Sequence, residues 1–250
     1  MIRLVCATPH AEAAFWTNTL LGRTLNFYRQ YAAQFELRLF PENRRGLPAV
    51  YNQAIEEVRR TPRILVFIHD DIHFFDLFWP QSIAAGLDAF DLIGTLGCKR
   101  HYPRQLSWVH VWQGDKVGNP RREDVSGAVG HFAHGEVEGA IPLAPLRPDH
   151  LAPFGGSVYM SYFGPPGQAV VLLDGMLLAC RSETLWQHHL RFDERFDFHF
   201  YDMDFCRQCE QKGLRMGTWT ISVLHGSHGS YGEAFYQAYP TYLAKWPEPT

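Results

Sequence analysis

Two adjacent carboxylates, Asp70 and Asp71, directly follow an apolar run over residues 64–68. Adjacent carboxylates repel one another unless a cation or strong hydrogen-bond donors lie between them. A hard divalent ion such as Mg²⁺ or Mn²⁺ meets that need, because it binds carboxylate and phosphate oxygens together. The alternative is an ordinary turn or helix N-cap after a strand, where Asp is common. The pair therefore indicates either a metal or ligand site or a simple turn.

A further group of carboxylates lies in residues 196–204, where Phe196, Phe198 and Phe200 alternate. This alternation predicts an extended segment with one aromatic face. A helix is expected to begin near Asp202, and a partly buried carboxylate at a helix start can act as a general base. Asp202 would instead be a plain N-cap if backbone donors used all of its oxygens.

His225 and His228 follow an apolar strand and are separated by glycine and serine. Imidazole can bind a metal or contact phosphate, and glycine lets the backbone approach a ligand closely. An isolated histidine is more often structural, and this spacing is not specific for a metal. On their own, the two histidines do not decide between these interpretations.

Weaker signals come from a turn and from aromatic side chains. Asp174 and Gly175 interrupt an apolar run, which indicates a functional turn or equally a β-hairpin turn. Arg44 and Arg45 are candidates for phosphate contacts, although exposed arginines usually contact water. Packing in a minor core is the alternative for four aromatic residues that could stack on sugar faces: Trp108, Trp112, Tyr159 and Tyr162.

The elements that must position these residues alternate between strand and helix, which predicts an α/β domain with a parallel core. In such sheets ligands bind beyond the carboxyl ends of the strands, where Asp70 and Asp71 lie. Residues 97–168 are less regular. Strands are expected at residues 2–7, 35–40, 63–68, 92–94, 107–112, 158–162, 169–173, 176–180 and 214–224, and helices at 11–31, 47–60, 77–89, from 182, at 202–213 and at 232–246.

Net charge, apolar run length and cysteine spacing argue against several classes of protein. The chain has 250 residues and a formal net charge of -3, so it lacks the general basic field that gathers nucleic acid. No apolar run is long enough to cross a bilayer. Five cysteines without framework spacing indicate reduced thiols in the cytoplasm. Cys206 and Cys209 form a C-x-x-C, which we interpret as two plain buried thiols, with a zinc or redox site as the alternative.

Taken in order, four segments resemble family 2 glycosyltransferases of the GT-A fold, especially a small bacterial branch similar to a streptomycin-biosynthesis glycosyltransferase. The specificity comes from their order and spacing, since each motif is short. The segments are GLPAVYNQAI at 46–55, VFIHDD at 66–71, LDGMLLA at 173–179, and FDE at 192–194 followed by FYDMDFC at 200–206 and Gly213.

The resemblance implies a fold and an activity. The fold would be α/β, GT-A and Rossmann-like, with a mixed, mostly parallel sheet flanked by helices in a single domain. Residues 1–96 would form the nucleotide-binding half, 97–168 a variable region, and 169–250 the acceptor and catalytic half with a C-terminal helix. The protein would move a sugar from a nucleotide-sugar donor to an acceptor hydroxyl, with inversion and with assistance from Mn²⁺ or Mg²⁺.

The resemblance also assigns roles to residues. Asp202 would be the catalytic base, with Asp204 in reserve. Two positions depart from the family pattern, because His69 stands where an Asp is frequent and Tyr201 where Glu is usual. The donor would be bound by Thr8, Asn43, Asn52, Asp70 and Asp71, the acceptor pocket would contain Asp174, Gly175, Trp108 and Tyr201, and the metal ligands would be Asp71, His225 and His228.

Two other functions remain open. A metal-dependent phosphoesterase would use His69, Asp71, His225 and His228 as ligands, and a non-catalytic module would bind a nucleotide sugar or glycan without turnover. For a transferase, the expected partners are the donor and a sugar, glycan or glycolipid acceptor, with no nucleic acid. We expect a bacterial cytoplasmic protein that meets any lipid-linked acceptor at the inner membrane surface.

Overall fold

The computed structural model describes residues 1–29, 35–133, 141–142, 157–227, 229 and 231–247. Its first sheet has six strands, and three of the five strand pairs are parallel. The mixed, mostly parallel sheet predicted from the sequence is therefore confirmed. In spatial order the strands are β14 (Met216–Thr218), β5 (Leu92–Gly94), β13 (Leu177–Arg181), β3 (Ile64–Ile68), β1 (Ile2–Ala7) and β2 (Phe35–Phe40).

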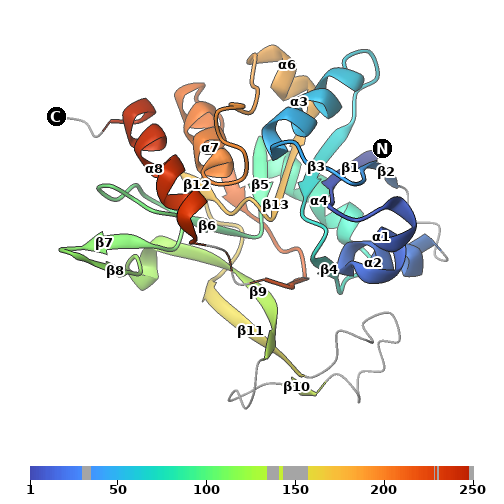
Figure 1. Cartoon of the computed structure of the whole chain (residues 1–250), viewed down its shortest axis with the longest axis horizontal. Helices are drawn as coiled ribbons and strands as arrows, with labels where there is room; N and C mark the ends of the chain where they lie inside the picture. The colour runs from blue at the N-terminus through green and yellow to red at the C-terminus, as the bar shows by residue number, and fades with distance from the viewer. Residues whose placement is uncertain (30–34, 134–140, 143–156, 228, 230, 248–250) are drawn as a thin grey trace.

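Helices flank this sheet, and α7 and α8 lie side by side (Figure 1). The helices expected at residues 47–60, 77–89, 202–213 and 232–246 are confirmed, with ends that differ by a few residues. No helix in the described part of the chain has the length and apolar character needed to cross a membrane. The helices are α1 (Glu12–Asn18), α2 (Leu20–Arg29), α3 (Leu47–Glu57), α4 (Trp79–Ala89), α6 (Ser182–Gln187), α7 (Tyr201–Gln211) and α8 (Glu233–Lys245).

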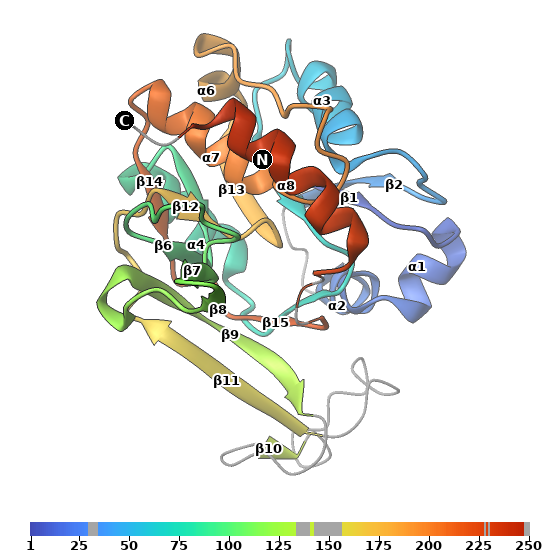
Figure 2. The same ribbon diagram turned by 60° about the vertical axis from the view of Figure 1, so that its left-hand side comes forward.

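A second, mostly antiparallel sheet was not expected from the sequence. Its two long strands, β9 and β11, form a ribbon that extends away from the first sheet (Figure 2). Its path is β10 (Ile141–Pro142), β11 (Ser157–Gly164), β9 (Val125–Ala133), β15 (Val223–His225) and β4 (Ile72–Phe74), with β6 (Leu96–Cys98) and β12 (Leu172–Leu173) attached. A separate hairpin joins β7 (Val111–Gln113) and β8 (Lys116–Gly118), and a 3₁₀ turn spans Arg122–Asp124.

Two predicted elements were wrong because each is divided. The helix expected at residues 11–31 is broken at Thr19, whose hydroxyl accepts a hydrogen bond from Gly22 N (2.9 Å) and so caps α2. The strand expected at residues 214–224 is two strands, β14 and β15, which belong to different sheets. In both cases apolar residues recur on each side of the break, but tertiary packing divides the segment.

The aromatic segment before α7 also differs from the expectation of one aromatic face. Phe196 and Phe200 are buried, whereas Phe198 is 50% exposed. Phe200 has a φ of 64°, a left-handed conformation that is uncommon for a residue other than glycine. This left-handed residue is the N-cap of α7, and the alternation of phenylalanines does not reveal it.

The five cysteines are free and buried, as the plain-thiol interpretation predicted. Cys206 and Cys209 both lie on α7, and burial raises the pKa of each thiol. The Cys206 sulfur accepts a hydrogen bond from Leu173 N (3.3 Å), which ties α7 to β12. These cysteines are therefore part of the core.

The end of β3 is fixed by backbone contacts from two distant segments. Leu65 to Ile68 are fully buried, which agrees with a strand covered on both faces. Leu21 N donates to Asp70 O (2.9 Å) at the start of α2, and Gly226 N donates to Asp71 O (2.8 Å) just after β15. The Asp70–Asp71 pair thus lies where the two sheets meet, since β3 belongs to the first and β15 to the second.

Candidate functional site

Two hollows open at the carboxyl end of β3, and His69, Phe198 and Ser227 line both of them. Their volumes are about 380 and 360 Å³, which suits small-molecule ligands. The first is also lined by Ala7, Thr8, Pro9, Asn43, Arg44, Arg45, Gly46, Leu47, Asp70, Asp71 and Asp197. The second is also lined by Leu106, Ser107, Trp108, Asp174, Gly175, Met176, His199, Phe200, Tyr201, Asp202, Met203, His225, Gly229, Tyr231 and Phe235.

The first hollow contains four of the five residues expected to bind a donor. Thr8 Oγ1 donates to Asp70 Oδ2 (2.6 Å), which fixes the carboxylate against the end of β1. Burial raises the pKa of Asp70, although the Thr8 hydrogen bond opposes this. The side chain of Asn43 shapes the adjacent turn, since it donates to Arg45 O (2.7 Å) and accepts from Arg45 N (3.2 Å).

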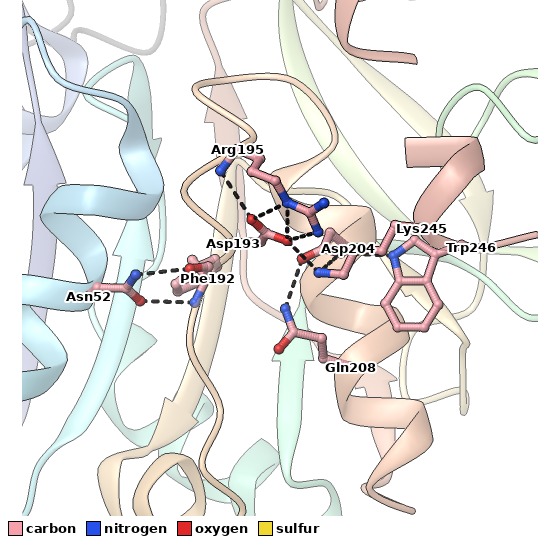
Figure 3. A network of polar contacts seen from close by, with 8 residues as sticks. All are labelled: Asn52, Phe192, Asp193, Arg195, Asp204, Gln208, Lys245 and Trp246. Atoms are coloured by element: carbon pink, nitrogen blue, oxygen red, sulfur yellow. Dashed lines mark hydrogen bonds and ion pairs between the residues drawn. The ribbon is translucent and has the colours of Figure 1, made fainter. Parts of the chain in front are cut away.

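Asn52, the fifth expected donor residue, lines neither hollow. Its amide forms a pair of hydrogen bonds with the backbone of Phe192, donating to the carbonyl oxygen and accepting from the N–H, both at 2.9 Å (Figure 3). It also donates to Glu194 Oε1 (3.0 Å). The structure therefore places Asn52 as a connection between α3 and the segment before α7, away from the first hollow.

A cluster of possible metal ligands lies at the junction of the two hollows. One ligand atom from each of His69, Asp71 and His225 can be chosen so that all lie within 4.8 Å of one another. Asp71 Oδ1 lies 3.4 Å from His225 Nε2, and this buried oxygen has no hydrogen-bond partner in the described part of the chain. A buried carboxylate oxygen without a donor fits a site for a cation.

Asp71 and His225 each shift the pKa of the other toward the charged form. Burial acts against the ionised form of Asp71, yet the contact with His225 outweighs it and holds the pKa of Asp71 well below its usual range. Burial likewise acts to lower the pKa of His225, but the Asp71 carboxylate raises it overall. A bound cation would replace the proton of His225 in balancing the Asp71 carboxylate, and the neutral imidazole would then be free to act as a ligand.

The third side chain of the cluster, His69, is oriented by Tyr201. The Tyr201 hydroxyl donates to Gly175 O (2.9 Å), so it accepts the proton of His69 Nε2 (2.9 Å). This tautomer leaves the lone pair on His69 Nδ1, and burial lowers the pKa of His69, which keeps the ring neutral. Two imidazoles and one carboxylate fit Mn²⁺ better than Mg²⁺, since Mg²⁺ prefers oxygen ligands. Of the three metal ligands expected for a transferase, Asp71 and His225 belong to the cluster and His228 lies outside the described residues, whereas His69 was expected as a ligand only for a phosphoesterase.

The second hollow contains the expected base. Asp202 stands at the start of α7, where its two oxygens accept from Gly175 N (2.9 Å) and from Met203 N (2.8 Å). Burial raises its pKa to about 7, and the nearby Asp174 carboxylate also raises it. A carboxylate has about four acceptor positions, so each oxygen keeps one free for a substrate proton. Asp202 thus contacts backbone donors and remains suited to act as a base near neutral pH.

The residues expected in the acceptor pocket also line the second hollow. Trp108 Nε1 donates to one oxygen of Asp174 (2.5 Å), and Met176 N donates to the other (2.8 Å). A Cβ at Gly175 would lie 2.4 Å from the Tyr201 hydroxyl, so only glycine fits between Asp174 and Tyr201. The 174–176 turn thereby holds Asp202 and Tyr201 at one end of the hollow.

Asp204, the reserve candidate for the base, has a different environment. Its carboxylate is fully buried and lines neither hollow. It accepts from Trp246 Nε1 (2.8 Å) and Gln208 Nε2 (2.8 Å), and it lies 2.6 Å from Lys245 Nζ (Figure 3). Asp204 therefore joins the start of α7 to the end of α8.

The lining residues that were not anticipated as part of the site include Asp197, Phe198, Ser227 and Tyr231. A Cβ at Gly46 would lie 2.7 Å from Asp197 Oδ1, so glycine allows the segment before α3 to approach residue 197. Leu47 N also donates to Asp197 O (2.7 Å). The phenylalanine alternation marked this segment, but it did not reveal the contacts with Gly46 and Leu47 that place residue 197 at the first hollow.

Fold and site together define a mixed α/β protein with a His–Asp–His cluster between two hollows.

No family model and no curated protein matches the sequence. Among solved structures, A197 from STIV is 10% identical over 90% of this chain and 85% of that chain, with a TM-score of 0.44. S. aureus TarS 1–349 is 13% identical over 94% of this chain and 62% of its own, with a TM-score of 0.43. The same TarS fragment in complex with UDP-GlcNAc is 12% identical over 95% and 61% of the two chains, with a TM-score of 0.40. At these TM-scores, any functional conclusion depends on the site itself.

Proposed function

We propose that this protein is a glycosyltransferase of the GT-A type that moves a sugar from a nucleotide sugar to an acceptor hydroxyl. One observation carries the proposal: the His69–Asp71–His225 cluster lies between two hollows, and a carboxylate with a pKa of about 7 lines the second. Displacement at a sugar carbon needs a leaving group on one side and a base on the other. This arrangement supplies a place for each.

The donor would occupy the first hollow. Thr8, Asn43 and Asp70 line it together with Arg44 and Arg45, whose cationic side chains suit a diphosphate. Asp71 and the two histidines of the cluster would hold Mn²⁺. When bound, the ion would supply charge stabilisation for the departing nucleoside diphosphate.

The acceptor would occupy the second hollow, with its hydroxyl beside Asp202. Asp202 takes the hydroxyl proton while the acceptor oxygen forms a bond to the anomeric carbon of the donor sugar. The bond from that carbon to the diphosphate breaks, and its electron pair leaves with the nucleoside diphosphate. Attack from the side opposite the leaving group inverts the anomeric centre.

The test is ligand-dependent thermal stability. The protein would be heated with a panel of nucleoside diphosphates and nucleotide sugars, including the UDP-GlcNAc of the TarS complex, with and without Mn²⁺. We expect one nucleotide to raise the Tm, and the increase to grow with Mn²⁺. His225→Ala should remove the effect of Mn²⁺, whereas the control His188→Ala, at the C-terminal end of α6 and outside both hollows, should keep it. Indifference to every nucleotide would refute a transferase.

The same three side chains favour a second candidate, a metal-dependent phosphoesterase. Two imidazoles and a carboxylate can hold an ion that activates water for attack on a phosphate ester. This activity predicts Mn²⁺-dependent hydrolysis of p-nitrophenyl phosphate without any sugar nucleotide, and it assigns no role to Asp202. A binding module without activity would instead bind the nucleotide sugar and turn over no acceptor.

A further inference from the structure

The second hollow differs from the first in the charge of its walls. Arg44 and Arg45 line the first hollow, but no lysine or arginine is found among the described residues around the second. The acidic side chains of the second are Asp174 and Asp202. A ligand that carries phosphate, sulfate or carboxylate would face these two carboxylates without a cationic side chain to balance them. The charge of an ion in the cluster would be balanced by Asp71 and by the diphosphate of the donor.

An exposed aromatic ring stands where the two hollows meet. Phe198 is 50% exposed, and it lines both hollows. Its ring is stacked on that of His69, with centroids 5.8 Å apart and planes 25° apart, so its orientation is fixed. An exposed phenylalanine held in one orientation offers a flat apolar surface to a ligand.

A second aromatic residue is held at the rim of the same hollow. Tyr231 is 39% exposed, and its hydroxyl lies 2.6 Å from His110 Nδ1 and 3.2 Å from Ser107 Oγ. These contacts tie the segment after β15 to the 107–110 turn. The second hollow therefore combines fixed, partly exposed aromatic rings with two carboxylates, a surface that suits the C–H face and the hydroxyls of a sugar ring.

We propose that the second hollow selects an acceptor sugar without anionic groups, which stacks on Phe198 beside the carboxylates of Asp174 and Asp202. This inference rests on the proposed transferase function and names the class of its acceptor. Neutral sugars and amino sugars belong to that class, and sugar phosphates do not. Phe198 is a specificity-determining residue on this proposal, because it supplies the stacking surface.

The binding experiment does not depend on turnover. The ligands would be methyl glycosides with gluco, galacto and manno configurations. Each would be prepared in a neutral, a 2-amino and a 6-phosphate form, and the glycosides of one form would be mixed as one pool. Saturation-transfer NMR would be recorded with the full chain at pH 8, above the pKa of about 7 of Asp202, and without Mn²⁺, because a paramagnetic ion would broaden the ligand signals. We expect transfer to the neutral or amino pool and binding of the phosphate pool that is weaker by roughly tenfold or more. A phosphate pool that binds as tightly as the neutral pool would overturn the proposal.

Variants at Phe198 test the stacking surface. Phe198→Leu should weaken binding of the preferred pool by roughly tenfold, and Phe198→Trp should retain it, because an aromatic face is restored. Tyr236→Leu is the matched control, since Tyr236 is 52% exposed on α8 and lines neither hollow. Equal binding by Phe198→Leu and wild type would refute a role for the ring.

The outcome is distinguishable from failure of the proposed function. Stabilisation by a nucleoside diphosphate reports on the first hollow, whereas saturation transfer to the glycosides reports on the second. A protein that binds the nucleotide but gives no transfer to any neutral or amino glycoside would remain a transferase candidate, and the acceptor class proposed here would be wrong.

Discussion

Replacement of Asp202 by Asn should alter activity and stability in a way that depends on pH. Asn keeps the size of the side chain but cannot take a proton from an acceptor. Loss of a general base lowers kcat by about 10²- to 10⁴-fold. The wild-type rate should fall as pH decreases through about 7, the pKa of Asp202, because the protonated carboxyl is inactive. The residual rate of Asp202→Asn should not show this step.

The stability effect follows from the same shift. Burial raises the pKa of Asp202 from 3.8 to about 7, so folding disfavours the charged form and the carboxylate destabilises the native state as pH rises. Because the pKa of Asp202 is higher in the folded than in the unfolded chain, ionisation of this carboxyl lowers the free energy of unfolding by about 1.7 kcal/mol at pH 5 and about 4 kcal/mol at pH 8. Water in the hollow weakens this cost, so wild type should lose about 1–2.5 kcal/mol relative to Asp202→Asn between these pH values.

Urea unfolding at pH 5 and pH 8 measures this difference. Asn also loses one acceptor for the backbone donors of Gly175 and Met203, which lowers stability at both pH values. The free energies of unfolding of wild type and variant are therefore subtracted at each pH, and the two differences, at pH 5 and pH 8, are compared. Asp88→Asn is the control, because the Asp88 side chain is 75% exposed in its ion pair with Arg181. A difference that does not vary with pH, or an unchanged kcat, would refute the assignment.

Two further substitutions test the supports of the site. Asp204→Ala should lower the free energy of unfolding by about 2–4 kcal/mol, since Lys245 loses a buried partner, while the exposed control Asp88→Ala should cost less than about 1 kcal/mol in the same denaturation assay. Retained kcat in folded Asp204→Ala would agree with its structural role, and a kcat loss as large as that of Asp202→Asn would contradict it. Gly175→Ala should lower both kcat and the free energy of unfolding, the latter by about 1–3 kcal/mol, because its Cβ would displace Tyr201. Gly130→Ala, whose Cβ would meet nothing nearer than 3.4 Å, is its control in activity and urea assays, and equal behaviour of the two would contradict this steric explanation.

Much of the first sheet was predictable because its strands have strong local signals. β3 is a continuous apolar run that ends at two charges, and β2 alternates apolar and charged residues. The helices α3, α4, α7 and α8 have the apolar spacing of packed helices. The location of Asp70 and Asp71 at the candidate site followed from the topology, since α/β proteins bind ligands at the carboxyl ends of central strands.

The second sheet could not be predicted in the same way. β4, β6 and β15 have three residues each, too few for a period to be measured. They become strands because non-local partners complete their hydrogen bonds, as when β15 pairs with both β4 and β9. The break at Thr19 has a similar origin, because Leu21 N donates to Asp70 O in a distant part of the chain.

For the site residues, residue type and order along the chain identified candidates, but the sequence did not reveal their hydrogen-bond partners. Asn52 and Asp204 have suitable chemistry, yet in the structure Phe192 and Lys245 occupy their polar atoms. Nothing in the local sequence marks these contacts, which join positions 140 and 41 residues apart. Asp202 differs because its backbone partners leave acceptor positions free.

The two departures from the family pattern are in contact. His69 stands where the resembling family often has Asp, and Tyr201 where it usually has Glu, and His69 Nε2 lies 2.9 Å from the Tyr201 hydroxyl. A glutamate at 201 could not donate to Gly175 O, and it would add a negative charge beside Asp174 and Asp202. The phenol donates and accepts at once, and so it joins His69 of the cluster to Gly175, whose N–H holds Asp202. On the proposed function, these hydrogen bonds would connect the proposed ion site to the proposed base.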